Sequence, residues 1–212
     1  MKFLTLLFVS VAKPHPHDGK LQPYNAAEKL LQYLDTSALN TINKGKLHKT
    51  TITEGPHAKR VVAVQDVNAP AETVIGHILD YQNYANRVPL VLQSEIYQRI
   101  SNVVAPNTET FFARLKTGKC GFSLEYYIKA THYPLHNSVV WHLDYDRDSD
   151  FDDACGYWHT SPHPQYPETK TRLYYSVDMI MGPNIPGFVA STINKMAATD
   201  AIGWVKKYSE KD

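Results

Sequence analysis

The last part of the chain places the strongest constraint on its fold. Between Pro186 and Tyr208, apolar side chains recur at helical spacing and polar side chains fall on the opposite side. Asn184 and Pro186 are start signals for a helix, and lysines near its end suit the helix dipole. The pattern predicts one long amphipathic helix that must bury an apolar stripe against another element. The stripe consists of Val189, Ile193, Met196, Ala197, Ala201, Trp204 and Tyr208.

Most of the residues before this helix alternate with the period of β-strands. Strands are expected at 47–53, 60–67, 91–100, 110–117, 122–131 and 154–160, and around two further alternating runs. Helices are expected at 25–34 and 70–79, with a short helix or turn after residue 80. The order predicts an α+β fold in which a curved antiparallel sheet wraps around the C-terminal helix. The predicted inward-facing sets are Phe111, Ala113 and Leu115; Phe122, Leu124, Tyr126 and Ile128; Trp141, Leu143 and Tyr145; and Leu173, Tyr175, Val177, Met179 and Met181.

Length and charge limit the classes of function. A chain of 212 residues suits one domain with a short extension. Its formal net charge is +1 and it contains no basic block, which argues against nucleic acid as the main partner. Nothing in the pattern indicates an oligomer.

Residues 1–22 are interpreted as a leader and linker. The apolar run from Phe3 to Ala12, with a small-residue cleavage signal at its end, resembles a secretory leader. A buried N-terminal segment or a truncated targeting sequence remains an alternative. The expected location is therefore the secretory pathway or the extracellular space, with an organelle lumen as the alternative. Cys120 and Cys155 then form either one disulfide or two buried free thiols.

A family resemblance covers most of the chain, from about residue 47 to 211. Val62 to Tyr97 contains a strand, Ala69-Pro70 at a helix start, Asp80-Tyr81 followed by a second tyrosine, and Val88-Pro89. Val140-Trp141, Gly156-Tyr157-Trp158, residues 171–175 and the final helix follow in the same order as in that family. The chain resembles START-like domains of the polyketide-cyclase and coenzyme-Q-binding-protein type, in the superfamily that includes the birch pollen allergen.

The resemblance implies a helix-grip fold, with a hydrophobic cavity between the sheet and the last helix. Residues 23–212 would form a single START-like domain that binds or transports a lipid, sterol, quinone, pigment or polyketide-like aromatic. Transient membrane contact would accompany such a role. The first alternative is a polyketide cyclase or aromatase that uses the same cavity, and the second is an accessory subunit that docks to a larger assembly.

The candidate ligand-binding residues are the apolar and aromatic side chains of the inward faces, together with one carboxylate. Asp200 lies near the centre of the helical stripe, where it would anchor a polar head group or form a salt bridge with Arg114 or Arg172. The aromatic candidates either face a ligand or simply fill the core. The set is Leu115, Phe122, Tyr126, Trp141, Leu143, Trp158, Tyr175, Val177, Met179, Ile193, Met196 and Asp200.

No metal, cofactor or catalytic residue is assigned. The aspartate-rich run at 144–153 fails the calcium-loop pattern, because Phe151 stands in place of the glycine and Tyr157 in place of the last glutamate. The sequence lacks hydrolase, metalloprotease and nucleotide-binding motifs. The enzyme alternative would depend on His142 or His159 meeting Asp200 inside the cavity.

Overall fold

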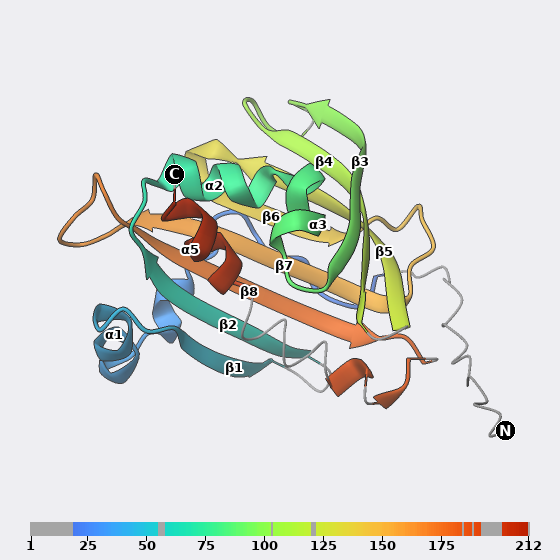
Figure 1. Ribbon diagram of the computed structural model, residues 1–212, viewed down its shortest axis with the longest axis horizontal. Helices are drawn as coiled ribbons and strands as arrows, with labels where there is room; N and C mark the ends of the chain where they lie inside the picture. The colour runs from blue at the N-terminus through green and yellow to red at the C-terminus, as the bar shows by residue number, and fades with distance from the viewer. Residues whose placement is uncertain are drawn as a thin grey trace, which may run out of the picture.

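The computed structural model describes residues 19–54, 58–102, 104–119, 122–183, 185–187, 189–191 and 201–211. Within them, one antiparallel sheet has eight strands in the order β1-β2-β8-β7-β6-β5-β4-β3 (Figure 1). The strands are β1 His48–Glu54, β2 Ala58–Val67, β3 Val91–Ser101, β4 Glu109–Lys119, β5 Phe122–Tyr133, β6 Ser138–Leu143, β7 Phe151–Pro162 and β8 Thr171–Met181. The helical elements are η1 Leu30–Tyr33, α1 Thr36–Asn43, α2 Ala71–Leu79, η2 Tyr81–Asn83, α3 Tyr84–Arg87, η3 Pro134–His136 and α5 Gly203–Ser209.

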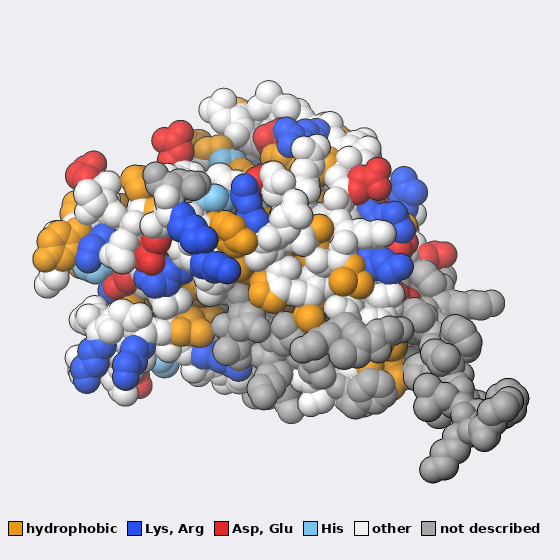
Figure 2. Space-filling model, viewed as in Figure 1, with side chains coloured by type: hydrophobic (Ala, Val, Ile, Leu, Met, Phe, Trp, Pro, Cys, Tyr) orange, Lys and Arg blue, Asp and Glu red, His pale blue; other side chains and the backbone are white. Residues whose placement is uncertain are grey.

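The strand order explains how the helices come to cover one face of the sheet. Strands β3 to β8 pair consecutively, and β8 then pairs with β2. The connection from β2 to β3 must therefore cross the sheet to its far edge, and it contains α2, η2 and α3. These elements lie with α5 on the concave face of the curved sheet (Figure 1). Figure 2 shows acidic and basic side chains interspersed over this side of the molecule.

The strand predictions and the helix at α2 are confirmed, whereas the helix expected at 25–34 is wrong. The Asn25 side chain accepts a hydrogen bond from Ala27 N at 2.9 Å, which forms a local turn in place of a helix cap. Only the short 3₁₀ element η1 follows it. The first α-helix is α1, where the Asp35 carboxylate accepts from Ala38 N at 2.7 Å and so caps the first turn.

The predicted C-terminal helix is described only at its two ends. Helical residues at 189–191 follow Pro186, whose carbonyl accepts from Val189 N and Ala190 N. Ala201 and Ile202 form a turn, and α5 begins at Gly203. Residues 192–200 lie outside the described part of the chain. None of the described helices is long and apolar enough to cross a membrane.

Both faces of the sheet are covered, each by a separate apolar cluster. The inner cluster joins the concave face to α2, α3 and α5. The outer cluster joins the opposite face to the N-terminal segment, with Leu21, Tyr24 and Leu30 packed on the strands. Residues 171–178 of β8 are therefore all buried, although the sequence alternation had indicated only one buried face.

Polar contacts fix the N-terminal segment to the outer face. Asp153 is fully buried and accepts from Leu21 N at 2.6 Å and from the Tyr145 hydroxyl at 3.0 Å. The Tyr24 hydroxyl lies 2.7 Å from Ser176 Oγ. The segment interpreted as a linker up to Gln22 thus already packs on the sheet at Leu21. Tyr145 lies beyond the end of β6 and serves this attachment.

Candidate ligand-binding cavity

A cavity of about 190 Å³ lies between the concave face of the sheet and the helical elements. No charged side chain occurs among the described residues that line it. The lining is formed by Tyr81, Tyr84, Val88, Pro89, Leu90, Val91, Leu115, Thr117, Tyr126, Ile128, Trp141, Phe151, Ala154, Trp158, Tyr175, Val177, Met179, Ala201 and Trp204. The chain has three tryptophans, and all of them are in this lining.

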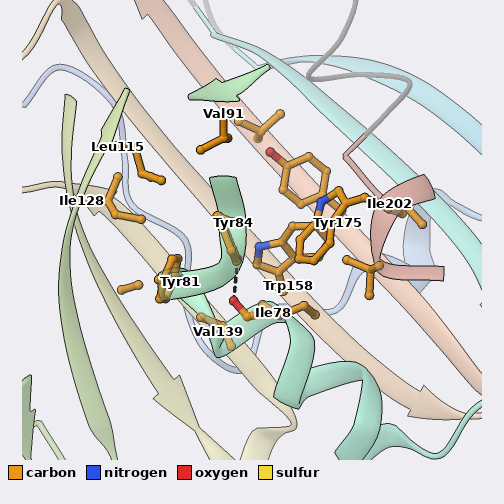
Figure 3. Packing of buried hydrophobic residues seen from close by; sticks show 14 of the residues in the cluster. Ile78, Tyr81, Tyr84, Val91, Leu115, Ile128, Val139, Trp158, Tyr175 and Ile202 are labelled. Carbon is orange, nitrogen blue, oxygen red and sulfur yellow. Dashed lines mark hydrogen bonds between the residues drawn. The ribbon is translucent and has the colours of Figure 1, made fainter. Parts of the chain in front are cut away.

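The central strands β7 and β8 supply one wall of the cavity through their alternating side chains. In their register, Ala154 pairs with Met179 and Trp158 pairs with Tyr175. Directly opposed residues of an antiparallel pair project to the same face, so all four side chains reach the cavity. The Trp158 and Tyr175 rings are in contact, with centroids 4.2 Å apart (Figure 3). This aromatic pair forms a rigid, flat part of the wall.

Gly156 shapes the same wall by leaving room for an indole. It lies between Ala154 and Trp158 and opposes Trp141 of β6 in the register. A Cβ atom placed on Gly156 would collide with the Trp141 ring. The indole therefore lies across the glycine, and the missing side chain sets the position of a cavity-lining aromatic residue.

Aromatic residues of η2, α3 and α5 close the opposite wall. Tyr84 packs edge-on against Trp204, with centroids 5.1 Å apart, and lies against Tyr81 at 4.8 Å. The Tyr84 hydroxyl donates to Ile78 O at 2.5 Å (Figure 3). Burial raises the pKa of Tyr81 and Tyr84 above the usual range, so both phenols stay neutral.

The loop at 88–91 marks the place where the cavity approaches the surface. Pro89 is exposed and yet belongs to the lining. Leu90 has φ of +66°, a left-handed conformation that costs energy for a residue with a side chain. Its carbonyl accepts from Gly118 N at 2.9 Å, which ties the loop to β4.

Seven of the residues predicted from sequence lie in the lining, where their role in ligand binding stays a prediction. Phe122 and Leu143 are not in it: Leu143 is fully buried in the inner core, and Phe122, at the start of β5, packs on the edge of that core. Ile193, Met196 and Asp200 lie outside the described residues. The seven are Leu115, Tyr126, Trp141, Trp158, Tyr175, Val177 and Met179.

The two arginines considered as partners of Asp200 have other partners. Arg114 pairs with Glu125 at 2.5 Å on β5. Arg172 pairs with Asp66 at 2.8 Å, on the outer side of the sheet. In both ion pairs the two partners lie on adjacent strands.

The candidate set omitted twelve lining residues: five lie in the β2–β3 connection, five lie on strands, and two lie at the C-terminal end. Tyr81, Tyr84 and Pro89 belong to the motifs that carried the family resemblance, and Trp204 belongs to the helical stripe. These motifs could be recognised in the sequence, but the path of the β2–β3 connection over the sheet could not be predicted from it. Ile128, Ala201 and Trp204 had been predicted to face the interior but were not among the candidates. The omitted residues are Tyr81, Tyr84, Val88, Pro89, Leu90, Val91, Thr117, Ile128, Phe151, Ala154, Ala201 and Trp204.

The histidines considered for catalysis lie on the outer face. His142 opposes Cys155, a member of the outer cluster, and its Nδ1 lies 2.7 Å from Leu143 O. His159 stacks on Tyr157, with centroids 6.1 Å apart, and packs at a tilt against Tyr174 of the same cluster, at 5.6 Å. Burial lowers the pKa of both imidazoles. The sheet separates them from the cavity, so the expectation that either acts inside it is wrong.

The acidic run and the cysteine serve the packing of the outer side. Asp144 accepts from the Tyr97 hydroxyl at 2.5 Å, and Asp150 accepts from Glu125 N at 2.6 Å. The described residues contain no group of three or more side chains placed to hold a metal ion. Cys155 is a buried free thiol, and burial raises its pKa to about 12. Cys120 lies outside the described residues.

Comparison with known proteins places the fold. No protein-family description matches the chain, and no curated protein matches it by sequence. Among solved structures, a START superfamily protein from Mycobacterium smegmatis superposes with a TM-score of 0.56 at 18% identity, covering 72% of this chain and 97% of the other.

Two further solved structures superpose on a similar share of the chain. The Zhui aromatase/cyclase from Streptomyces sp. R1128 superposes with a TM-score of 0.59 at 15% identity, covering 73% of this chain and 95% of the other. A STAR-related lipid transfer protein from Xanthomonas axonopodis superposes with a TM-score of 0.55 at 13% identity, covering 76% of this chain and 97% of the other. The chain therefore has a START-like helix-grip fold, as its curved antiparallel sheet, its covering helices and these superpositions show.

Proposed function

We propose that the protein binds one hydrophobic small molecule in the cavity between the sheet and its helices. The observation that carries the proposal is the apolar, aromatic lining, whose described residues include all three tryptophans and no charged group. Apolar ligand surface gains about 25 cal/mol per Å² on leaving water, and a preformed pocket keeps the ordering cost low. The solved neighbours include a lipid transfer protein and an aromatase/cyclase, which fits a shared container for apolar molecules.

Neither alternative function has an observation of its own in favour. The cyclase hypothesis needs an acid or base in the cavity, and the described lining contains only neutral tyrosines and a threonine as hydroxyl groups. The docking hypothesis needs a contiguous exposed apolar patch. The exposed large hydrophobic residues of the described part come from five separate segments: Leu31, Leu92, Val104, Leu135 and Tyr166.

Tryptophan fluorescence gives a direct test, because every tryptophan lines the cavity. The probe is N-phenyl-1-naphthylamine, a neutral apolar fluorophore that accepts energy from tryptophan. We expect saturable quenching of tryptophan emission with a stoichiometry of one. The variant Ala154→Phe places a ring in the cavity and should weaken binding at least tenfold.

The matched control is Val140→Ala. Val140 is buried in the outer cluster, so its truncation destabilises the fold without touching the cavity. It should bind the probe with wild-type affinity. Equal affinity in Ala154→Phe and wild type, or the absence of saturable quenching in the wild type, would refute the proposal.

A further inference from the structure

Two phenol hydroxyls in the cavity have no protein partner among the described residues. Tyr126 and Tyr175 both line the cavity, and neither has a hydrogen bond to any described residue. Tyr175 is only 7% exposed. In Figure 3 its ring lies beside Trp158, and its hydroxyl is on the side of Val91, another lining residue. A hydroxyl that lies in an apolar cavity without a protein partner can donate a hydrogen bond to an acceptor on a bound ligand.

The other two tyrosines of the lining differ from Tyr126 and Tyr175, because their hydroxyls interact with protein groups. Tyr84 already donates its hydroxyl to Ile78 O, and Tyr81 interacts with Tyr84. Only Tyr126 and Tyr175 are left as donors on the sheet side of the cavity among the described tyrosines. Each ring is held by an aromatic neighbour: Tyr126 lies edge-on to Phe151 at 5.0 Å, and Tyr175 lies against Trp158 at 4.2 Å. Rigid placement of a donor lowers the ordering cost of a hydrogen bond.

The electrostatics of the lining define the acceptor. Burial raises the pKa of Tyr126 and of Tyr175, and the nearby Tyr126 phenol further raises that of Tyr175, so both remain neutral donors. No cation occurs in the described lining to compensate a ligand carboxylate or phosphate, whose burial would be expensive. A neutral carbonyl or ether oxygen satisfies the donors without bringing a charge into the cavity.

We infer that Tyr126 and Tyr175 form the polar anchor of the cavity and select neutral apolar ligands that carry a hydrogen-bond-accepting oxygen, such as a ring ketone. This inference rests on the proposed function of the cavity. The flat walls around Trp158 and Tyr175 hold the apolar part of the ligand, and the hydroxyls fix its orientation. Tyr126 and Tyr175 thereby determine which apolar molecules are preferred.

A matched pair of ligands tests the anchor. 9-Fluorenone and fluorene have the same ring system and differ in one carbonyl oxygen, and each can compete with N-phenyl-1-naphthylamine for the cavity. The wild type should bind fluorenone more tightly than fluorene, by about 3- to 10-fold for each hydrogen bond formed. Tyr126→Phe and Tyr175→Phe should each reduce that preference and leave the affinity for fluorene unchanged.

The control and a spectroscopic readout separate an anchor from a structural effect. Tyr157→Phe also removes a buried hydroxyl, but one that donates to Ala26 O on the outer face, so it should keep the fluorenone preference. The carbonyl stretching frequency of bound fluorenone should be lower in the wild type than in the double variant Tyr126→Phe/Tyr175→Phe. Equal affinity of the two ligands in the wild type, or a preference that survives in the double variant, would overturn the anchor while the proposed function stands. Failure of both ligands and of the naphthylamine to bind would overturn both.

Discussion

Gly156 offers the sharpest test of how the cavity wall is built. Replacing it with alanine adds a single methyl group, which must displace the Trp141 indole that lies across this position. Its backbone is not in the left-handed region, so the added methyl group acts through this collision rather than through strain. Overpacking of this kind costs about 1 to 3 kcal/mol. For a chain of this length, each kcal/mol lowers the melting temperature by about 2 to 4 °C.

A double-mutant cycle isolates the cause. Unfolding in urea, followed by far-ultraviolet circular dichroism, gives the free energy of unfolding of the wild type, Gly156→Ala, Trp141→Leu and the double variant. Without the indole, the methyl group at position 156 has room, so Gly156→Ala should cost little in the Trp141→Leu background. We expect a coupling free energy of about 1 to 3 kcal/mol between the two sites. An equal loss in both backgrounds would refute the reasoning.

Three further predictions concern the outer side of the sheet. Asp66→Asn leaves the buried Arg172 guanidinium without its carboxylate and should lower the free energy of unfolding by about 3 to 5 kcal/mol. Urea titrations measure this loss, and a change below about 1 kcal/mol would contradict the pairing. Because burial raises the Cys155 pKa to about 12, iodoacetamide at pH 8 should label this thiol only when urea unfolds the protein, and rapid labelling of the native protein would contradict its burial. Because burial lowers the pKa of His142, this side chain takes up a proton at higher pH in the unfolded state than in the folded state. Stability should therefore fall as pH drops below about 6.5. Thermal unfolding from pH 5 to 7 should show this fall in the wild type and a flatter dependence in His142→Gln.

The fold was largely predictable from the sequence because its strands and α2 have strong local signals. Period-two alternation located the strands, and Pro70 marked the start of α2. The helix at 25–34 was wrong because Asn25 supports a turn as readily as a cap, whereas Asp35 caps the real helix ten residues later. Such competition between side-chain hydrogen bonds is local and leaves no trace in hydrophobic periodicity.

The outer cluster and the part of the cavity lining that comes from the β2–β3 connection could not be predicted for a different reason. Leu21 and Tyr24 reach the back of the sheet from a segment that has no regular period. Tyr81 and Pro89 reach the cavity because their connection crosses the sheet between opposite edges. Both placements depend on long-range packing. Alternation within a strand could indicate Trp158 and Tyr175, but not which residues would face them.

The measurement that tests the central claim most directly is native mass spectrometry of the protein purified without detergent, before and after incubation with excess N-phenyl-1-naphthylamine. The account predicts one apolar molecule per chain, either carried through purification and identified by solvent extraction, or supplied by the probe. It also predicts that Ala154→Phe carries neither. A chain that has the mass of the protein alone under both conditions would contradict the account.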